Sequence, residues 1–169
     1  MPGHARAAIL AAIVAAAASL LLLALFPRAR PAPQVTFVSL KGERIASTGL
    51  KGRVVLVNFW ATDCVICNRE MPEMVRTYDR YHARGLEFIA VAMRYDPPHY
   101  VVDYAAKNRL PFTVALDPLG ELAAAFGEVA VTPTTFLIDK RGNIVSRMQG
   151  EPDFARLRQL LEEKLAEPA

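Results

Sequence analysis

Apolar residues in this chain gather in short compact runs, which alternate with longer stretches that carry apolar residues at helical spacing. A compact run rich in β-branched residues predicts a buried strand, and helical spacing predicts a helix that buries one face. The clearest strand is 53–60, RVVLVNFW, in which only the first residue and Asn58 are polar. The expected strands are 35–40, 53–60, 86–93, 112–116, 134–139 and 143–149.

Helical patterns fill the intervals between these strands. The first predicted helix contains Pro72, which should kink it, and is followed by Gly85, a residue suited to end a helix. Two Asp-Pro pairs, at 96–97 and 117–118, are typical of a helix cap followed by a first-turn proline. The expected helices are 65–84, 97–108, 118–126 and 152–166. The last helix should bury an apolar stripe made of Phe154, Leu157, Leu160, Leu161 and Leu165.

The order of these elements predicts an α/β fold. Strands and helices alternate through most of the chain, which favours a central sheet with parallel members and helices that flank it. The last two strands are separated only by Lys140-Arg141-Gly142, so they should form an antiparallel hairpin at the edge of that sheet. The expected sheet is therefore mixed.

The N-terminal segment has a different character. Residues 7–26 carry no charge and are almost entirely Ala, Leu, Ile and Val. About 20 such residues in a helix cross the roughly 30 Å core of a bilayer. We expect 1–27 to be a signal anchor with a transmembrane helix, 28–34 a linker rich in Pro and Arg, and 35–169 the folded domain. The alternative is a secretory signal cleaved within 29–33.

Charge gives little further guidance. The net charge is +3 without a basic run, so the sequence offers no argument for nucleic-acid binding. Arg28 and Arg30 follow the apolar run and only Arg6 precedes it, a distribution that weakly favours a cytoplasmic domain. We expect a periplasmic domain nonetheless, because the chemistry predicted below belongs outside the cytoplasm.

The chain has two cysteines, Cys64 and Cys67, at the junction between strand 53–60 and the helix that follows it. A Cys-x-x-Cys pair in a β-α context indicates a redox motif, because free N–H groups at a helix start stabilise a thiolate. Cys64 would attack a disulfide, and Cys67, one turn further on, would resolve the mixed disulfide. One alternative is a pair of inert buried cysteines.

The other alternative is half of a metal site. Zinc would need two further ligands, and the histidines are His4, before the apolar run, and His82 and His99, both expected to be exposed. We therefore expect neither a metal nor another cofactor.

The sequence resembles the TlpA/ResA branch of membrane-anchored, thioredoxin-like thiol-disulfide oxidoreductases. Residues 58–62 read NFWAT and residues 70–72 read EMP on either side of the cysteines, and VTPTTFLID at 131–139 resembles the cis-proline strand of that family. The resemblance covers the chain from about 35 onward and implies a thioredoxin-like fold with an inserted β-α unit at 86–108.

The same resemblance implies roles for four supporting residues. The bond between Thr132 and Pro133 would be cis, and the backbone of Thr132 would pair with substrate as an added strand; the alternative is an ordinary trans proline at a strand start. Glu70 would handle protons near the cysteines, at a pKa raised by partial burial, although a glutamate in the first turns of a helix is favourable in any case. Trp60 would flank the site, although an ordinary core position is the alternative.

Two positions depart from the family pattern. Ile66 stands where the family has proline, and Asp63 stands where it has an aromatic or small residue. A carboxylate beside Cys64 disfavours its thiolate, and a less stable reduced form makes a more reducing couple. We therefore expect a reductant.

The expected function is reduction of protein disulfides in the periplasm. The resemblance implies a membrane electron donor of the DsbD/CcdA type and, as substrate, apocytochrome c or a copper-site assembly protein. The competing interpretations are a thiol oxidase or isomerase on the same fold, and a non-enzymatic Cu(I) metallochaperone that uses both thiols.

Overall fold

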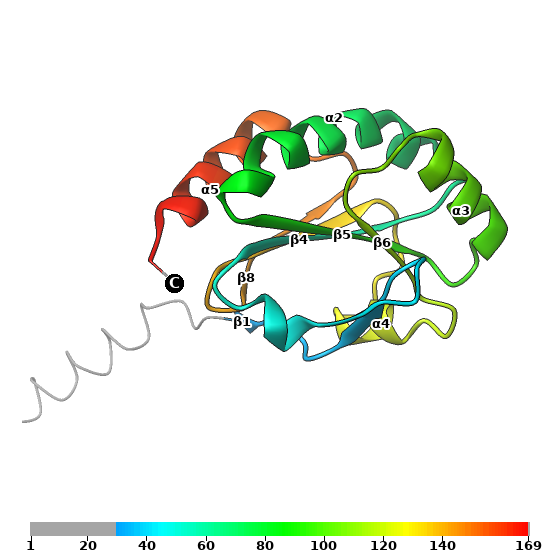
Figure 1. Cartoon of the computed structure of the whole chain (residues 1–169), viewed down its shortest axis with the longest axis horizontal. Helices are drawn as coiled ribbons and strands as arrows, with labels where there is room; N and C mark the ends of the chain where they lie inside the picture. The colour runs from blue at the N-terminus through cyan, green and yellow to red at the C-terminus, as the bar shows by residue number, and fades with distance from the viewer. Residues whose placement is uncertain (1–29, 169) are drawn as a thin grey trace, which may run out of the picture.

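The computed structural model describes residues 30–168 and has helices on both sides of a central sheet (Figure 1). The strands are β1 (Arg30–Pro31), β2 (Thr36–Val38), β3 (Arg44–Ala46), β4 (Val54–Trp60), β5 (Leu86–Ala92), β6 (Thr113–Leu116), β7 (Thr134–Ile138) and β8 (Asn143–Gln149). The helices are α2 (Val65–Tyr81), α3 (Pro98–Lys107), α4 (Glu121–Ala125) and α5 (Phe154–Ala166), with short 3₁₀ turns η1 (Ser47–Leu50) and η2 (His82–Arg84).

The main sheet has six strands in the order β1-β8-β7-β4-β5-β6. β4 pairs in parallel with β5 and antiparallel with β7, while β5 and β6 are parallel and β7 and β8 antiparallel. The mixed α/β sheet and the closing hairpin expected from the sequence are therefore confirmed, although the edge beside the hairpin is formed by the two-residue β1 and not by β8. The helices α2, α3 and α5 lie on one side of the sheet, and η1 and α4 lie on the other (Figure 1).

β4 divides the core into two clusters. All seven of its residues are buried. Val54, Leu56 and Trp60 pack with α2 and α5, whereas Val57 and Phe59 pack with α4 and β2 on the opposite face. This alternation follows from the two-residue period of a strand that is covered on both faces.

α2 and α5 bury the faces that their patterns predict, but α2 ends at Tyr81, three residues earlier than expected, and α5 begins at Phe154, two residues later. α2 contains Pro72 and is followed by η2 and then Gly85, whose φ of 104° is a left-handed conformation that favours glycine. In α5, Leu157, Leu161 and Leu165 are buried and the other two predicted residues pack against the same cluster. The capping carboxylate of α5 is Asp153, which accepts hydrogen bonds from the N–H groups of residues 155 and 156.

Three sequence expectations need correction. Asp96 does not cap the following helix, whose N-cap is Pro97, because its carboxylate binds Thr62 instead. α4 begins only at Glu121 and its N-cap is Gly120, so Asp117 is not the N-cap, although its carboxylate does bind two N–H groups of the first turn. The strand expected at 35–40 shortens to β2, which pairs with the unpredicted β3 in a separate two-stranded sheet.

The predicted linker includes two residues that pair with the sheet, since β1 lies antiparallel to β8. The apolar run at 7–26 lies outside the described residues. Within residues 30–168, no helix has the length and apolar character needed to cross a membrane.

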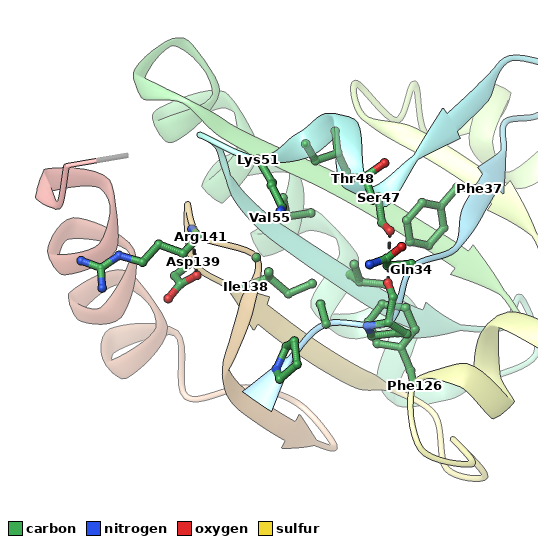
Figure 2. A pocket seen from close by; sticks show the side chains of 16 residues that line it. Gln34, Phe37, Ser47, Thr48, Lys51, Val55, Phe126, Ile138, Asp139 and Arg141 are labelled. Carbon is green, nitrogen blue, oxygen red and sulfur yellow. Dashed lines mark hydrogen bonds between the residues drawn. The ribbon is translucent and has the colours of Figure 1, made fainter. Parts of the chain in front are cut away.

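A cavity of about 120 Å³ lies between the segment after β1 and the sheet (Figure 2). Phe37, Val55 and Phe126 line it together with the polar residues Gln34 and Asp139. The side chain of Val55 points to the face of β4 that packs against α4. The cavity is therefore on the opposite face of the sheet from the layer that contains α2 and the cysteines.

The docking of α5 on the sheet gives a stability prediction. Leu161 has no exposed surface and lies in the same cluster as Trp60. Leu161→Ala is expected to lower the free energy of unfolding by about 2–5 kcal/mol, because it removes buried apolar atoms and leaves a cavity. Urea unfolding of the oxidised protein, followed by the fluorescence of Trp60, measures this. Gln159→Ala, on the exposed side of α5, is the control and should change it by less than about 0.5 kcal/mol. If Leu161→Ala lowers the free energy of unfolding no more than the Gln159→Ala control does, α5 is not firmly docked.

Candidate active site

Cys64 and Cys67 form a disulfide at the start of α2. Their Cα atoms are 5.2 Å apart, which is within the range that a disulfide requires. Cys64 is the N-cap of the helix, and its Sγ accepts a hydrogen bond from the N–H of Cys67 at 3.2 Å. The predicted juxtaposition of the two sulfurs is therefore present.

The helix start favours a thiolate at Cys64. N–H groups in the first turn of a helix have no partner within the helix, and they carry partial positive charge. The N–H of Cys67 is one of these groups and already points at the Cys64 sulfur. After the disulfide is reduced, the same N–H is placed to stabilise a negative charge on Cys64.

The two sulfurs differ in access. Cys64 is half-buried, whereas Cys67 has no exposed surface and belongs to the core cluster beneath α2. A sulfur must be reached by its partner before exchange occurs, so access separates the attacking thiol from the resolving one. Of the two sulfurs, only that of Cys64 is therefore accessible from the surface.

The loop before β7 approaches the same edge of the sheet. The peptide bond between Thr132 and Pro133 is cis, as the resemblance implies. Thr134 pairs with Phe59, so this loop lies beside the end of β4 from which the cysteine turn begins. The hydrogen bonds within residues 30–168 leave the N–H and C=O of Thr132 without a partner. Its backbone is therefore free to pair with another chain.

Glu70 is fully buried on α2, one turn after Cys67. Its Oε1 accepts a hydrogen bond from the Nδ2 of Asn58 at 3.0 Å, and that same amide nitrogen donates to Thr135 Oγ1 at 2.9 Å. Burial raises the pKa of Glu70 to about 8, while the hydrogen bond from Asn58 opposes that rise. A carboxyl with such a pKa exchanges protons near neutral pH.

Trp60 is a residue of the core. Its side chain has no exposed surface, and its ring centroid lies 5.0 Å from that of Tyr104. It belongs to the same core cluster as Cys67, and its burial matches the alternative of an ordinary core position. Among the described residues no group of three His, Cys, Asp or Glu side chains is arranged to hold a metal ion, and His82 and His99 are exposed as predicted.

Three polar residues near the cysteines escaped the sequence reasoning. The carboxylate of Asp96 and the amide of Asn68 both bind Thr62, which lies in the turn before Cys64. For Asp96, the sequence does contain a signal that places it near the cysteines. It follows the strand predicted to run parallel to β4, and the carboxyl ends of parallel neighbours lie at one edge of the sheet.

The burial of Glu70 predicts a pH dependence of stability. The unfolded chain loses this proton near pH 4.5, whereas the folded protein keeps it to about pH 8. Between these two pH values the folded protein therefore binds one more proton than the unfolded chain. The free energy of unfolding should fall by about 1.4 kcal/mol for each unit of rising pH. Urea titrations of the oxidised protein between these pH values measure the slope.

Glu70→Gln should remove this contribution, because glutamine does not titrate. Glu121→Gln replaces an exposed glutamate and serves as the matched control, which should keep the wild-type slope. Equal slopes for the wild type and Glu70→Gln would show that Glu70 is already ionised in the folded protein.

Comparison with known proteins agrees with this geometry. The family model described as Redoxin matches residues 27–161. The thiol-disulfide oxidoreductase ResA of Bacillus thuringiensis subsp. konkukian is 34% identical over 132 residues, which cover 78% of this chain and 75% of that protein. ResA of Geobacillus thermodenitrificans is 35% identical over 131 residues, which cover 78% of this chain and 74% of that protein.

A solved structure gives the same result for the fold. The thiol:disulfide interchange protein of the thioredoxin family from Chlorobium tepidum TLS superposes with a TM-score of 0.75 at 30% identity, covering 83% of this chain and 99% of its own. The thioredoxin-like fold expected from the two motifs is thus confirmed. The chain belongs to the Redoxin family, within which it is a ResA-like thiol-disulfide oxidoreductase of the thioredoxin superfamily.

Proposed function

We propose that this protein reduces disulfides in exported proteins, with Cys64 as the attacking thiol and Cys67 as the resolving thiol. The roles are assigned from the difference in solvent exposure between the two cysteines. Cys64 is half-buried at the helix start, and its sulfur accepts a hydrogen bond from the N–H of Cys67. The side chain of Cys67 itself is fully buried. A substrate sulfur reaches Cys64 first.

The exchange proceeds in two steps. The Cys64 thiolate attacks one sulfur of the substrate disulfide, the other substrate sulfur leaves as a thiolate, and a mixed disulfide forms. The Cys67 thiolate then attacks Cys64 Sγ, which releases the second substrate thiol and closes the internal disulfide. Two electrons pass to the substrate. Glu70, one turn from Cys67 and with a pKa near 8, exchanges protons with it.

The surroundings of the disulfide support a protein substrate. Val65 is 78% exposed between the two cysteines, and Val131 is 51% exposed beside Thr132. Exposed apolar side chains next to an unpaired backbone segment suit an extended peptide, whose backbone adds a strand while its side chains cover the apolar rim. A small disulfide would use neither feature.

The proposed location is the periplasmic side of a bacterial inner membrane, with residues 7–26 as a single-pass anchor. Support comes from the uncharged apolar run in the sequence and from disulfide chemistry, which operates mainly outside the cytoplasm. The proposed electron donor is a membrane protein of the DsbD/CcdA type. The proposed substrates are apocytochrome c or a copper-site assembly protein, as the resemblance to the ResA branch implies.

Trapping tests the assignment of the cysteines. Cys67→Ala leaves Cys64 able to attack but removes the thiol that resolves the mixed disulfide, so covalent complexes with substrate proteins should accumulate. Non-reducing electrophoresis and mass spectrometry of cells that express the full chain identify them. Cys64→Ala is the matched control and should capture almost nothing. Complexes that form on Cys64→Ala, or captured proteins confined to the cytoplasm, would contradict the proposal.

The reduction potential tests the direction of electron flow. Asp63 is exposed next to Cys64, and its carboxylate opposes the thiolate. The potential is expected closer to that of thioredoxin, about −270 mV, than to that of DsbA, about −120 mV. Equilibration with glutathione and with dithiothreitol measures it. A value near that of DsbA would favour the thiol oxidase.

A further inference from the structure

The segment that follows β5 reaches the redox site at three points. The N–H of Met93 donates to the C=O of Trp60 at 3.0 Å. The hydroxyl of Tyr95 lies 3.3 Å from Thr132 Oγ1, beside the cis-proline. The carboxylate of Asp96 binds Thr62, two residues before Cys64. One short segment therefore touches the end of β4, the turn before Cys64 and the loop before β7.

The contact made by Asp96 is the strongest of these. Oδ2 accepts the N–H of Thr62 and Oδ1 accepts its hydroxyl, both at 2.6 Å. Asp96 is only 6% exposed, whereas Tyr95 is 54% exposed and its contact is longer. Burial shields such short hydrogen bonds from competition with water.

This carboxylate has no role in the helix that follows it. The N-cap of α3 is Pro97, and no side chain caps that helix. Among residues 30–168, the only side-chain hydrogen bonds of Asp96 are the two to Thr62. A buried carboxylate needs compensating donors, so the position of Asp96 is tied to that of Thr62.

Thr62 is held on its other side as well. Its C=O accepts a hydrogen bond from Asn68 Nδ2 at 2.9 Å, so its N–H, hydroxyl and C=O all have partners. The turn itself is closed by the N–H of Cys64, which donates to the C=O of Ala61 at 3.2 Å. Only one residue separates Thr62 from Cys64.

We propose that Asp96 is a positioning residue of the redox reaction, whose carboxylate fixes the turn before Cys64 and thereby holds the Cys64 sulfur against the N–H of Cys67. We call the two hydrogen bonds from Thr62 to Asp96 the clamp. Without the clamp, the turn is free to shift and the sulfur loses the donor that stabilises its thiolate. Asp96 acts on Cys64 itself, so this role does not depend on which disulfides the protein reduces.

The test separates the geometry of the clamp from its charge. Asparagine at position 96 keeps an oxygen for the N–H of Thr62 and presents an amide to its hydroxyl, but it carries no charge. Alanine removes both contacts. In full-length protein carrying Cys67→Ala, Cys64 is the sole thiol, so the rate of its alkylation by iodoacetamide at pH 7 reports thiolate formation directly.

Asp96→Ala is expected to slow this alkylation at least about tenfold, because small displacements of a reacting group are costly. Asp96→Asn should stay within about threefold of the parent rate, since the clamp persists. Asp103→Ala, an exposed carboxylate on α3, is the control for removal of a surface charge and should match the parent. An unchanged rate for Asp96→Ala, or equal losses for alanine and asparagine, would overturn the proposal.

Thr62 provides a second test if Asp96→Ala does not fold. Thr62→Val removes the hydroxyl but preserves the shape of the side chain, and Thr62→Ser restores the hydroxyl. Valine should lower the alkylation rate and serine should recover it, while circular dichroism shows all variants folded. Equal rates for valine and serine would overturn the proposal. Because alkylation needs no substrate, failure of the wild type to reduce protein disulfides would count against the proposed function alone.

Discussion

The position of the disulfide depends on the burial of β4 between β5 and β7. All seven residues of β4 are buried, and its neighbours fix it from both sides, one parallel and one antiparallel. The carboxyl end of a parallel neighbour and the amino end of an antiparallel neighbour fall at the same edge of a sheet. For this reason the turn before Cys64, the segment 93–96 and the loop 131–133 meet, although they lie far apart in the sequence. The site is therefore assembled by the pairing of the sheet.

The same strand carries the polar residue that connects it to proton chemistry. Asn58 lies on the face of β4 that packs against α2, where burying an amide is costly, and its Oδ1 has no partner among residues 30–168. Its nitrogen donates to Glu70 on α2 and to Thr135 on β7, so one buried network joins three elements. Because the hydrogen bond from Asn58 opposes the rise in the pKa of Glu70, the packing of β4 and the proton affinity of the site are linked.

The sequence revealed those parts of the fold and site whose signals are local. The apolar run of β4, the spacing of the cysteines and the apolar stripe of α5 each lie within one element, and the structure confirms them. The cis bond before Pro133 came from resemblance alone. β3 could not be predicted, because it has three residues, none of them fully buried, and it is defined mainly by pairing with β2. The role of Asp96 is not visible in the sequence, because Asp-Pro is a local capping signal, whereas its actual partner, Thr62, lies 34 residues away.

Two buried carboxylates near one edge of the sheet differ in the donors that surround them. Glu70 receives one hydrogen bond, from an amide, and its Oε2 has no partner among residues 30–168. Desolvation therefore dominates, and the carboxyl retains a proton at a pKa near 8. Asp96 is nearly as buried, yet each of its oxygens accepts a short hydrogen bond from Thr62. Burial alone thus does not determine what a carboxyl group does in this fold. An oxygen left without a donor favours proton exchange, whereas a carboxylate with both oxygens bonded to one turn fixes the position of that turn.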